Sequence, residues 1–420
     1  MKRDNTAVSI IIPIYNVEKY LTACLNSVCH QTKEDIEIIC IDDCSTDNSS
    51  KVIDEFAQRD DRIKAIRNQK NCGRLYARKI GVLEASGKYV MFLDGDDFYA
   101  EDACEIAYNQ IESASVDILQ FGMNIINKGN APQYEVDSFS NFVMPYKGKI
   151  EKESVLKSCF VDEKYNYNLV NKIYKAELCK KAFANLDDSY YCMAEDLLAY
   201  FVLSYYAGSY AGITDKLYNY NFAIGVSKPG ELDLEGLDRR CAGAESVAAV
   251  ERFLTGQGTF DEYQDAYKKI ERRILSDNFD AWYYRLPSDK REEGYVIFEK
   301  HWGKDKVILG LLYDIENKQY DINQKGNRIY ELDNELICAR SRFDKELAEK
   351  NLVIDQLGSE TSTLTQRLGE TTNLCEKTEQ ERKDVQAQYE HVLNSLSYRI
   401  GCAVTWIPRK VAGVIRRTKI

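Results

Sequence analysis

Residues 89–97 read YVMFLDGDD, an apolar run followed at once by a cluster of carboxylates. The run is typical of a strand buried in a sheet, and the cluster contains Asp94, Asp96 and Asp97. In α/β proteins, ligands bind at the C-terminal ends of parallel strands, where this cluster would lie. Carboxylates so close together are costly unless they are solvated, paired or bound to a cation. Two interpretations follow: a site for Mg²⁺ or Mn²⁺, or a solvated turn built on Asp94-Gly95.

Strand-like and helix-like segments alternate over the first 125 residues. Nearly continuous apolar runs, typical of strands covered on both faces, occupy 8–14, 36–41, 63–66, 89–93 and 116–122. Segments with the apolar spacing of helices lie between them, at 18–28, 52–57 and 73–85. This alternation predicts parallel strands joined by right-handed crossovers, so the fold class is α/β.

Composition narrows the classes of function. The 420 residues predict two or three domains, and a hydrophobic content of 44% is typical of a globular protein. The net charge of −11 argues against a general nucleic-acid binder. The 13 cysteines form no CxxC pair and no Cys/His cluster, so no zinc site is indicated and reduced thiols are expected. The sequence shows no signal peptide and no apolar span long enough for a membrane helix, which predicts a cytoplasmic protein.

The loops after the early strands carry side chains suited to a nucleotide. Tyr15 and Asn16 follow the first strand, Asp43 follows the second, and Arg74 follows the third. These loops should converge with the acidic cluster on one edge of the sheet. There a tyrosine ring can stack on a base, an Asp can accept from a ring N–H, and an Arg can neutralise phosphates. Their joint position favours a nucleoside diphosphate site over turn chemistry alone.

Three stretches together resemble family 2 glycosyltransferases, which have the GT-A fold: 8–16 (VSIIIPIYN), 41–47 (IDDCSTD) and 92–97 (FLDGDD). The resemblance covers roughly residues 7–125 and implies a Rossmann-like nucleotide-diphospho-sugar transferase domain. It implies that the DxD motif, Asp94-Gly95-Asp96, holds the metal and the donor diphosphate, with Asp96 as the closest ligand and Asp97 nearby. It also implies that a few positions bind the donor nucleotide: Pro13, Tyr15, Asn16, Asp43, Arg74 and Arg78.

The second half of the chain resembles the same family. The matching segments are 171–175 (NKIYK), 191–198 (YCMAEDLL) and 217–227 (LYNYNFAIGVS). In this family the acidic motif carries the catalytic base, a role that falls on Asp196 here, with Glu195 as its neighbour and substitute. Without the resemblance, the two residues would be an ordinary acidic first turn of a helix. Residues 1–230 are therefore expected to form the GT-A domain, with 1–125 binding the nucleotide-sugar and 126–230 supplying the acceptor side and the base.

The expected activity is an inverting, metal-dependent hexosyltransferase of the EC 2.4 class, acting in cell-surface polysaccharide or glycan synthesis. A UDP-sugar is the expected donor, and a hydroxyl on a glycan or lipid-linked saccharide is the expected acceptor. Two alternatives stay open: an inactive scaffold that binds sugar nucleotides, and a sugar nucleotidyltransferase. The latter would normally carry a Gly-rich basic loop after the first strand, where this chain has Tyr15-Asn16-Val17-Glu18. Histidine-based triads are disfavoured because the 3 histidines lie in no motif.

The chain beyond residue 230 divides by composition. Residues 231–327 are expected to form a helical extension that packs through apolar spacing. Residues 328–396 contain a broken heptad pattern, which predicts a coiled-coil-like helix and a homo-oligomer; a solvated single helix is the alternative. Residues 397–420 combine Trp406 with clustered Arg and Lys, which suits a peripheral attachment to the anionic cytoplasmic membrane face. A basic tail that docks to protein is the alternative for this last segment.

Overall fold

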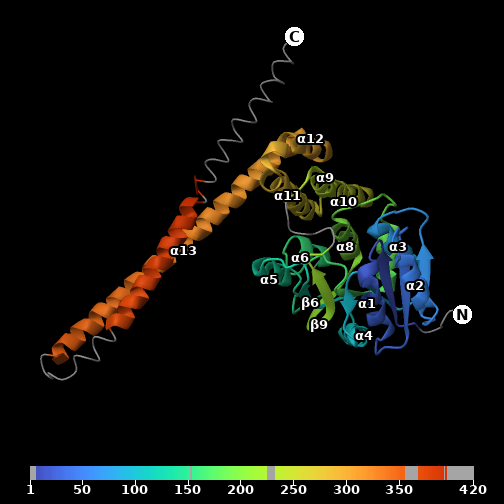
Figure 1. Cartoon of the computed structure of the whole chain (residues 1–420), viewed down its shortest axis with the longest axis horizontal. Coiled ribbons are helices and arrows are strands. Elements are labelled where there is room, and N and C mark those ends of the chain that lie inside the picture. The colour runs from blue at the N-terminus through green and yellow to red at the C-terminus, as the bar shows by residue number, and fades with distance from the viewer. Residues whose placement is uncertain (1–5, 152–153, 225–231, 355–367, 392, 395–420) are drawn as a thin grey trace, which may run out of the picture. The chain divides into compact units, whose positions relative to one another are not determined.

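The computed structural model describes residues 6–151, 154–224, 232–354, 368–391 and 393–394. It divides into two compact units, residues 1–307 and 308–420. A mixed β-sheet with helices packed around it forms the first unit, and helices form the described part of the second (Figure 1). The predicted α/β fold class is confirmed for the first unit. The tail predicted at 397–420 lies outside the described residues.

The sheet of the first unit has nine strands among the described residues, in the order β3-β2-β1-β4-β8-β6-β9-β5, with β7 paired to β9. Their bounds are β1 Val8–Ile14, β2 Ile36–Asp42, β3 Ile63–Arg67, β4 Tyr89–Phe92, β5 Phe98–Tyr99, β6 Ile118–Asn127, β7 Lys149–Ile150, β8 Lys172–Lys175 and β9 Tyr210–Phe222. The strands β3, β2, β1 and β4 are parallel, as the sequence predicts. However, β8 lies between β4 and β6 and is antiparallel to both. It therefore joins the strands β3, β2, β1 and β4 to the strands β6, β9 and β5 in one sheet.

Helices cover this sheet because its central strands are apolar on both faces. All seven residues of β1 are buried. The helices of this part are α1 Glu18–Cys29, α2 Ser49–Ala57, α3 Arg74–Glu84, α4 Ala103–Ala114, α5 Gln133–Phe142, α6 Val155–Phe160, α7 Ala176–Ala184 and α8 Glu195–Tyr206. A Cβ at Gly81 would lie 2.4 Å from Cγ2 of Ile11, so glycine lets α3 pack closely on β1. This contact fixes the helix that carries Arg74 and Arg78.

The first unit continues through a helical region after β9. Its elements are α9 Leu234–Cys241, α10 Gly243–Gln257, α11 Gln264–Asp280, a π-helix Ala281–Arg285, a 3₁₀-helix Ser288–Lys290 and α12 Arg291–Trp302. The hydroxyl of Ser246 on α10 donates to the carbonyl of Met193 at 2.7 Å, directly before α8. Most of the predicted helical extension is therefore packed against the half of the domain that carries the acidic motif. The boundary between the two units falls after Val307, inside this extension and inside α13.

Two helical segments form the described part of the second unit: α13, Lys304–Ile354, continues into it, and residues 368–391 are also helical. Nε of Arg382 lies 3.3 Å from Oδ1 of Asp333, so the later segment runs alongside α13. Leu332 and Leu336 are buried along the same part of α13. Self-association through 328–396 stays a prediction.

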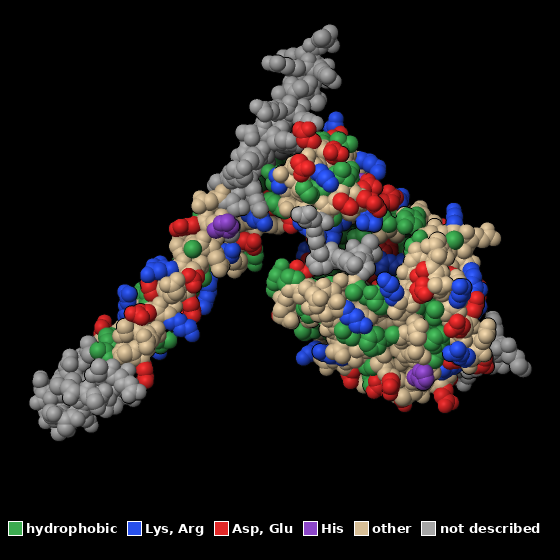
Figure 2. All heavy atoms as spheres, in the orientation of Figure 1, with side chains coloured by type: hydrophobic (Ala, Val, Ile, Leu, Met, Phe, Trp, Pro, Cys, Tyr) green, Lys and Arg blue, Asp and Glu red, His purple; other side chains and the backbone are tan. Residues whose placement is uncertain are grey.

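No described helix has the length and hydropathy needed to span a bilayer. The surface shown in Figure 2 carries mixed charge. On the face shown in Figure 2, Asp and Glu side chains are interspersed with Lys and Arg over most of the surface.

Candidate active site

A pocket of about 430 Å³ lies at the C-terminal ends of the parallel strands. The loops after β1 and β4 and the start of α3 form its walls, together with residues just before α8. Most of the predicted donor-binding residues line it: Pro13, Tyr15, Asn16, Asp43, Arg74, Asp94, Gly95 and Asp96. The structure therefore brings together residues from four separate loops, as the sequence predicted from the position of the strand ends.

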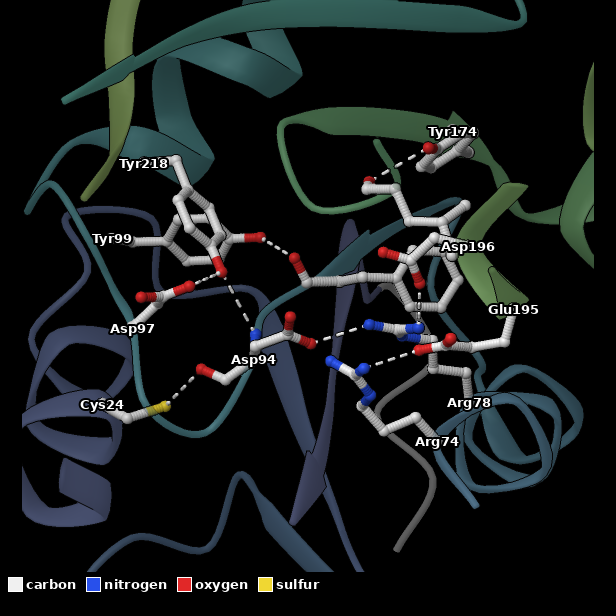
Figure 3. Close-up of polar contacts among 12 residues, drawn as sticks. Cys24, Arg74, Arg78, Asp94, Asp97, Tyr99, Tyr174, Glu195, Asp196 and Tyr218 are labelled. Atoms are coloured by element: carbon white, nitrogen blue, oxygen red, sulfur yellow. Dashed lines mark hydrogen bonds and ion pairs between the residues drawn. The ribbon is translucent and has the colours of Figure 1, made fainter. Parts of the chain in front are cut away.

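Arg78 joins the two acidic motifs of the chain. Its side chain is fully buried, its Nη2 donates to Oδ1 of Asp94 at 2.8 Å, and its Nη1 donates to Oδ1 of Asp196 (Figure 3). Burial lowers the pKa of Arg78, but the charges of Asp196 and Asp94 raise it by more. The pKa therefore lies above its ordinary value, and the guanidinium stays charged. Two carboxylates from opposite halves of the domain are thus held on one buried cation. Arg78 has no exposed surface with which to contact a phosphate.

Arg74 holds the other acidic residue of the second motif. Its Nη2 lies 2.9 Å from Oε1 of Glu195, whose side chain is only 5% exposed. Burial raises the pKa of Glu195, and Arg74 opposes that shift. The carboxylate of Asp196 is 28% exposed despite its contact with Arg78. Of the two candidate bases, Asp196 is therefore the one with more room to meet a substrate hydroxyl.

The local backbone sets the position of this acidic turn. Ala194 precedes α8 in the left-handed conformation, at φ 58° and ψ 21°, which usually favours glycine. The turn places Glu195 and Asp196 in the first turn of the helix, where the helix dipole favours negative charge. The conformation costs an alanine about 1 kcal/mol, and the contacts of the two carboxylates with arginines offset it.

Asp94, Asp96 and Asp97 do not share one environment. Asp94 and Asp96 line the pocket, whereas Asp97 is only 2% exposed. Oδ2 of Asp97 accepts from the hydroxyl of Tyr218 at 2.7 Å (Figure 3). Its Oδ1 accepts from the backbone N–H of Asn221, also at 2.7 Å. Burial, and then Asp96, raise the pKa of Asp97. Both oxygens of Asp97 thus tie the β4 loop to β9, and the predicted set of three carboxylates is reduced to two at the pocket.

Asp43 and Asn16, two residues predicted to contact the nucleotide, already accept hydrogen bonds from neighbouring loops. Asp43 accepts from the side-chain amide of Asn68 at 2.7 Å and from the backbone N–H groups of Cys72 and Gly73 at 2.9 and 2.7 Å. The side chain of Asn16 accepts from the backbone N–H of Thr46 at 2.8 Å. Both residues line the pocket, and these bonds hold the neighbouring loops in place.

Sequence reasoning missed several residues of the pocket. Tyr190, Tyr191 and Cys192 come from the segment before α8, and Arg239 comes from α9 in the helical extension. Tyr190 is 58% exposed and Tyr15 is 43% exposed, so two aromatic rings are available at the pocket. The sequence did offer a signal for Tyr190, because it is an aromatic residue a few positions before the acidic motif. Arg239 gave none, because it lies in an ordinary polar helix turn.

The carboxylates at the pocket fit a divalent cation whose other ligands come from elsewhere. No group of three or more His, Cys, Asp or Glu side chains suited to a metal occurs within the described residues. Mg²⁺ and related ions are often bound by one or two carboxylates together with water and substrate phosphates, a pattern that Asp94 and Asp96 match. Burial, and then Asp94, raise the pKa of Asp96 to about 6, and a bound cation would favour the charged form of both carboxylates.

The mixed sheet, with its pocket at the strand ends, defines a GT-A-like domain. Residues 9–165 match the family described as Glycosyl transferase family 2. The matched segment includes Asp94 and Asp96 and ends before Glu195 and Asp196.

Among curated relatives, glycosyltransferase GlyG of Streptococcus pneumoniae is 36% identical over 112 residues, which is 27% of this chain and 37% of GlyG. The poly(ribitol-phosphate) beta-glucosyltransferase of Bacillus spizizenii is 32% identical over 178 residues, or 41% of this chain and 26% of the relative. The matches thus span well under half of these relatives. A crystal structure of S. aureus TarS in complex with UDP aligns with a TM-score of 0.44 and 20% identity, over 72% of this chain and 89% of that one.

Proposed function

We propose that this protein is a glycosyltransferase that moves a sugar from a nucleotide-diphosphate sugar to a hydroxyl group of a saccharide acceptor. The single observation that carries the proposal is the Asp94–Arg78–Asp196 bridge, which fixes a DxD loop next to a second acidic residue. The family of residues 9–165 supports the reaction class. The names of the relatives, glycosyltransferases that include one acting on poly(ribitol-phosphate), support a role in cell-surface polysaccharide synthesis.

In this proposal the pocket binds the donor through complementary chemistry. The nucleotide base stacks on Tyr15 or Tyr190, and the diphosphate lies near Arg74 and Arg239, whose charges it would neutralise. A divalent cation held by Asp94 and Asp96 would stabilise the negative charge that develops on the departing nucleoside diphosphate. A UDP-sugar is the proposed donor.

Asp196 is the proposed general base. Its carboxylate takes the proton from the acceptor hydroxyl as that oxygen attacks the anomeric carbon, and the bond to the diphosphate breaks. Arg78 is a positioning residue, because it is buried and holds Asp196 at a fixed place relative to Asp94. A single displacement of this kind inverts the anomeric configuration. The first test is UDP release from a panel of UDP-sugars and saccharide acceptors, with Mn²⁺ and with EDTA.

Asp96→Ala is expected to remove the part of UDP affinity that depends on Mn²⁺. A carboxylate of Asp96 lines the pocket, and no ion pair within 4 Å occupies it among the described residues. The loss should reach at least the roughly 10- to 100-fold that removal of an outer-shell partner costs a metal site. Calorimetric titration of UDP with Mn²⁺ and with EDTA measures the effect. Asp102→Ala, at the start of α4 and outside the pocket, is the matched control, and unchanged Mn²⁺ dependence in Asp96→Ala would rule out this metal site.

Tyr190→Ala is expected to weaken UDP binding by roughly 10-fold, because stacking on an aromatic side chain contributes about 1–3 kcal/mol per base. The ring is 58% exposed at the pocket, so its removal should leave the fold intact. Uridine and ribose 5-phosphate, titrated in parallel, separate the base from the phosphate contribution. Tyr134→Ala is the control, since Tyr134 is 71% exposed on α5 and does not line the pocket. Equal affinities in the two variants would exclude stacking on Tyr190.

A further inference from the structure

A second cavity, of about 270 Å³, lies beside the first turn of α8 and shares no lining residue with the donor pocket. Its walls come from the end of α5, the segment 163–167, α8 and α11. Leu197 of α8 lines it and follows Asp196 directly in the chain. Asp196 itself lines neither cavity; its neighbour Leu197 lines the second cavity, and Asp94, which shares Arg78 with Asp196, lines the donor pocket.

The lining of this second cavity is basic and aromatic. Lys164, Lys269 and Arg273 face a single acidic residue, Glu163, in a chain whose net charge is −11. The guanidinium of Arg273 lies over two aromatic rings that both line the cavity, 5.0 Å from the centroid of Phe142 and 5.1 Å from that of Tyr167. Aromatic faces attract a cation without cancelling its charge, so Arg273 keeps its capacity to bind an anion.

No carboxylate of the described residues forms an ion pair with Arg273 or Lys269 within 4 Å. Nζ of Lys269 donates instead to the backbone carbonyl of Val161 at 2.5 Å, which fixes the amine beside the cavity. Asp277, one helical turn after Arg273, is the nearby acidic group on α11, and it lies outside the cavity lining. The cavity thus presents two cationic donors, of which Arg273 interacts electrostatically with Asp277 but forms no ion pair within 4 Å among the described residues.

Tyr167 connects this cavity electrostatically to the base. Burial raises the pKa of Tyr167, Arg273 opposes the shift, and Asp277 and Asp196 add to it. The ring therefore lies within the field of both Arg273 and Asp196. Tyr167 is also stacked on Phe160, with centroids 6.0 Å apart and planes 7° from parallel, so two aromatic rings line this cavity.

We propose that the second cavity binds a negatively charged group, a phosphate or a carboxylate, of the saccharide acceptor while the acceptor hydroxyl reaches Asp196. This inference rests on the glycosyltransferase function proposed above and adds the acceptor class to it. A guanidinium donates two parallel hydrogen bonds to either oxyanion, and an aromatic face suits the apolar side of a sugar ring. A cavity of about 270 Å³ has room for one charged sugar unit, so the rest of a polymeric acceptor would extend into solvent.

The test is a saturation-transfer NMR titration of the full chain with glucose 6-phosphate, glucuronate and glucose, with UDP and Mn²⁺ at saturation to fill the donor pocket. At least one charged sugar is expected to bind roughly 10-fold or more tightly than glucose, as hydrogen bonds to charged groups predict. If glucose 6-phosphate binds more tightly than glucuronate, the recognised group is a phosphate; if glucuronate binds more tightly, it is a carboxylate. Arg273→Gln should reduce the preference to near 1, and Arg273→Lys should keep much of it.

Lys268→Gln is the matched control, because Lys268 is exposed on the same helix, contacts Gln264 and does not line the cavity. Equal binding of charged and neutral sugars by the wild type would overturn the inference, as would equal losses in Arg273→Gln and Lys268→Gln. Unchanged UDP affinity in Arg273→Gln shows that the fold is intact. If UDP does not bind the wild type at all, the proposed function fails. The sugar titration without nucleotide then still decides whether the cavity selects anions.

Discussion

Replacing Asp196 by Asn is expected to lower kcat by about 10³-fold while leaving the affinity for UDP unchanged. Asparagine keeps the size of the side chain and one oxygen that can accept from Nη1 of Arg78. It cannot take the proton of an acceptor hydroxyl, so only the chemical step should suffer. The measurement combines initial rates of UDP release with calorimetric titration of UDP in the same preparation.

Glu195→Gln is the comparison that identifies the base. Glu195 is nearly buried and bound to Arg74, so its neutral analogue should disturb the pocket without removing a proton acceptor. We expect a smaller loss of kcat than in Asp196→Asn, accompanied by a weaker donor affinity. Full turnover by Asp196→Asn would exclude Asp196 as the base. A large loss confined to Glu195→Gln would transfer the role to Glu195.

Replacing Arg78 by Met is expected to lower the free energy of unfolding by about 3 kcal/mol and to abolish turnover. The guanidinium is fully buried between Asp94 and Asp196, so its removal leaves two partly buried carboxylates without their cation. Arg78→Lys should not restore function, because an ammonium lacks the fork that reaches both partners at once. Denaturant unfolding monitored by circular dichroism measures the loss.

A double-mutant cycle separates this bridge from a general packing defect. Adding Asp196→Asn to Arg78→Met removes one unpaired charge, so the two changes should be less than additive by about 0.5–3 kcal/mol. Lys64→Met is the matched control, since Lys64 pairs with Glu84 on the exposed surface, where such pairs contribute at most about 1 kcal/mol. Equal stabilities of Arg78→Met and Lys64→Met would contradict the bridge, as would strict additivity in the cycle.

The sequence predicts the parallel half of the sheet well, because local signals suffice there. An apolar run such as Val8–Ile14 is typical of a strand covered on both faces, and the acidic loop after Tyr89–Phe92 is then expected at the sheet edge. The insertion of Lys172–Lys175 between β4 and β6 is different. It depends on antiparallel pairing between distant segments, for which a short mixed sequence such as KIYK carries no local signal.

The site shows the same division between local and tertiary information. Asp94 and Asp96 could be singled out from the residues around them, whereas Asp196 could be singled out only through the resemblance to the family. The role of Arg78 could not, because its two partners are brought together only by the packing of α3 against the sheet and α8. Asp97 is the converse case: its neighbours suggest a ligand, but Tyr218 of β9 takes up its carboxylate.

The most direct measurement of the central claim is a crystal structure of the full chain with UDP and Mn²⁺, with anomalous data collected for manganese. The account predicts one manganese peak bonded to the carboxylate of Asp96 and to the diphosphate, with the uracil ring against Tyr15 or Tyr190. It also predicts that Asp196 remains on Arg78 and faces the vacant position of the sugar. A nucleotide bound away from this pocket, or a metal with no contact to Asp94 or Asp96, would contradict the account.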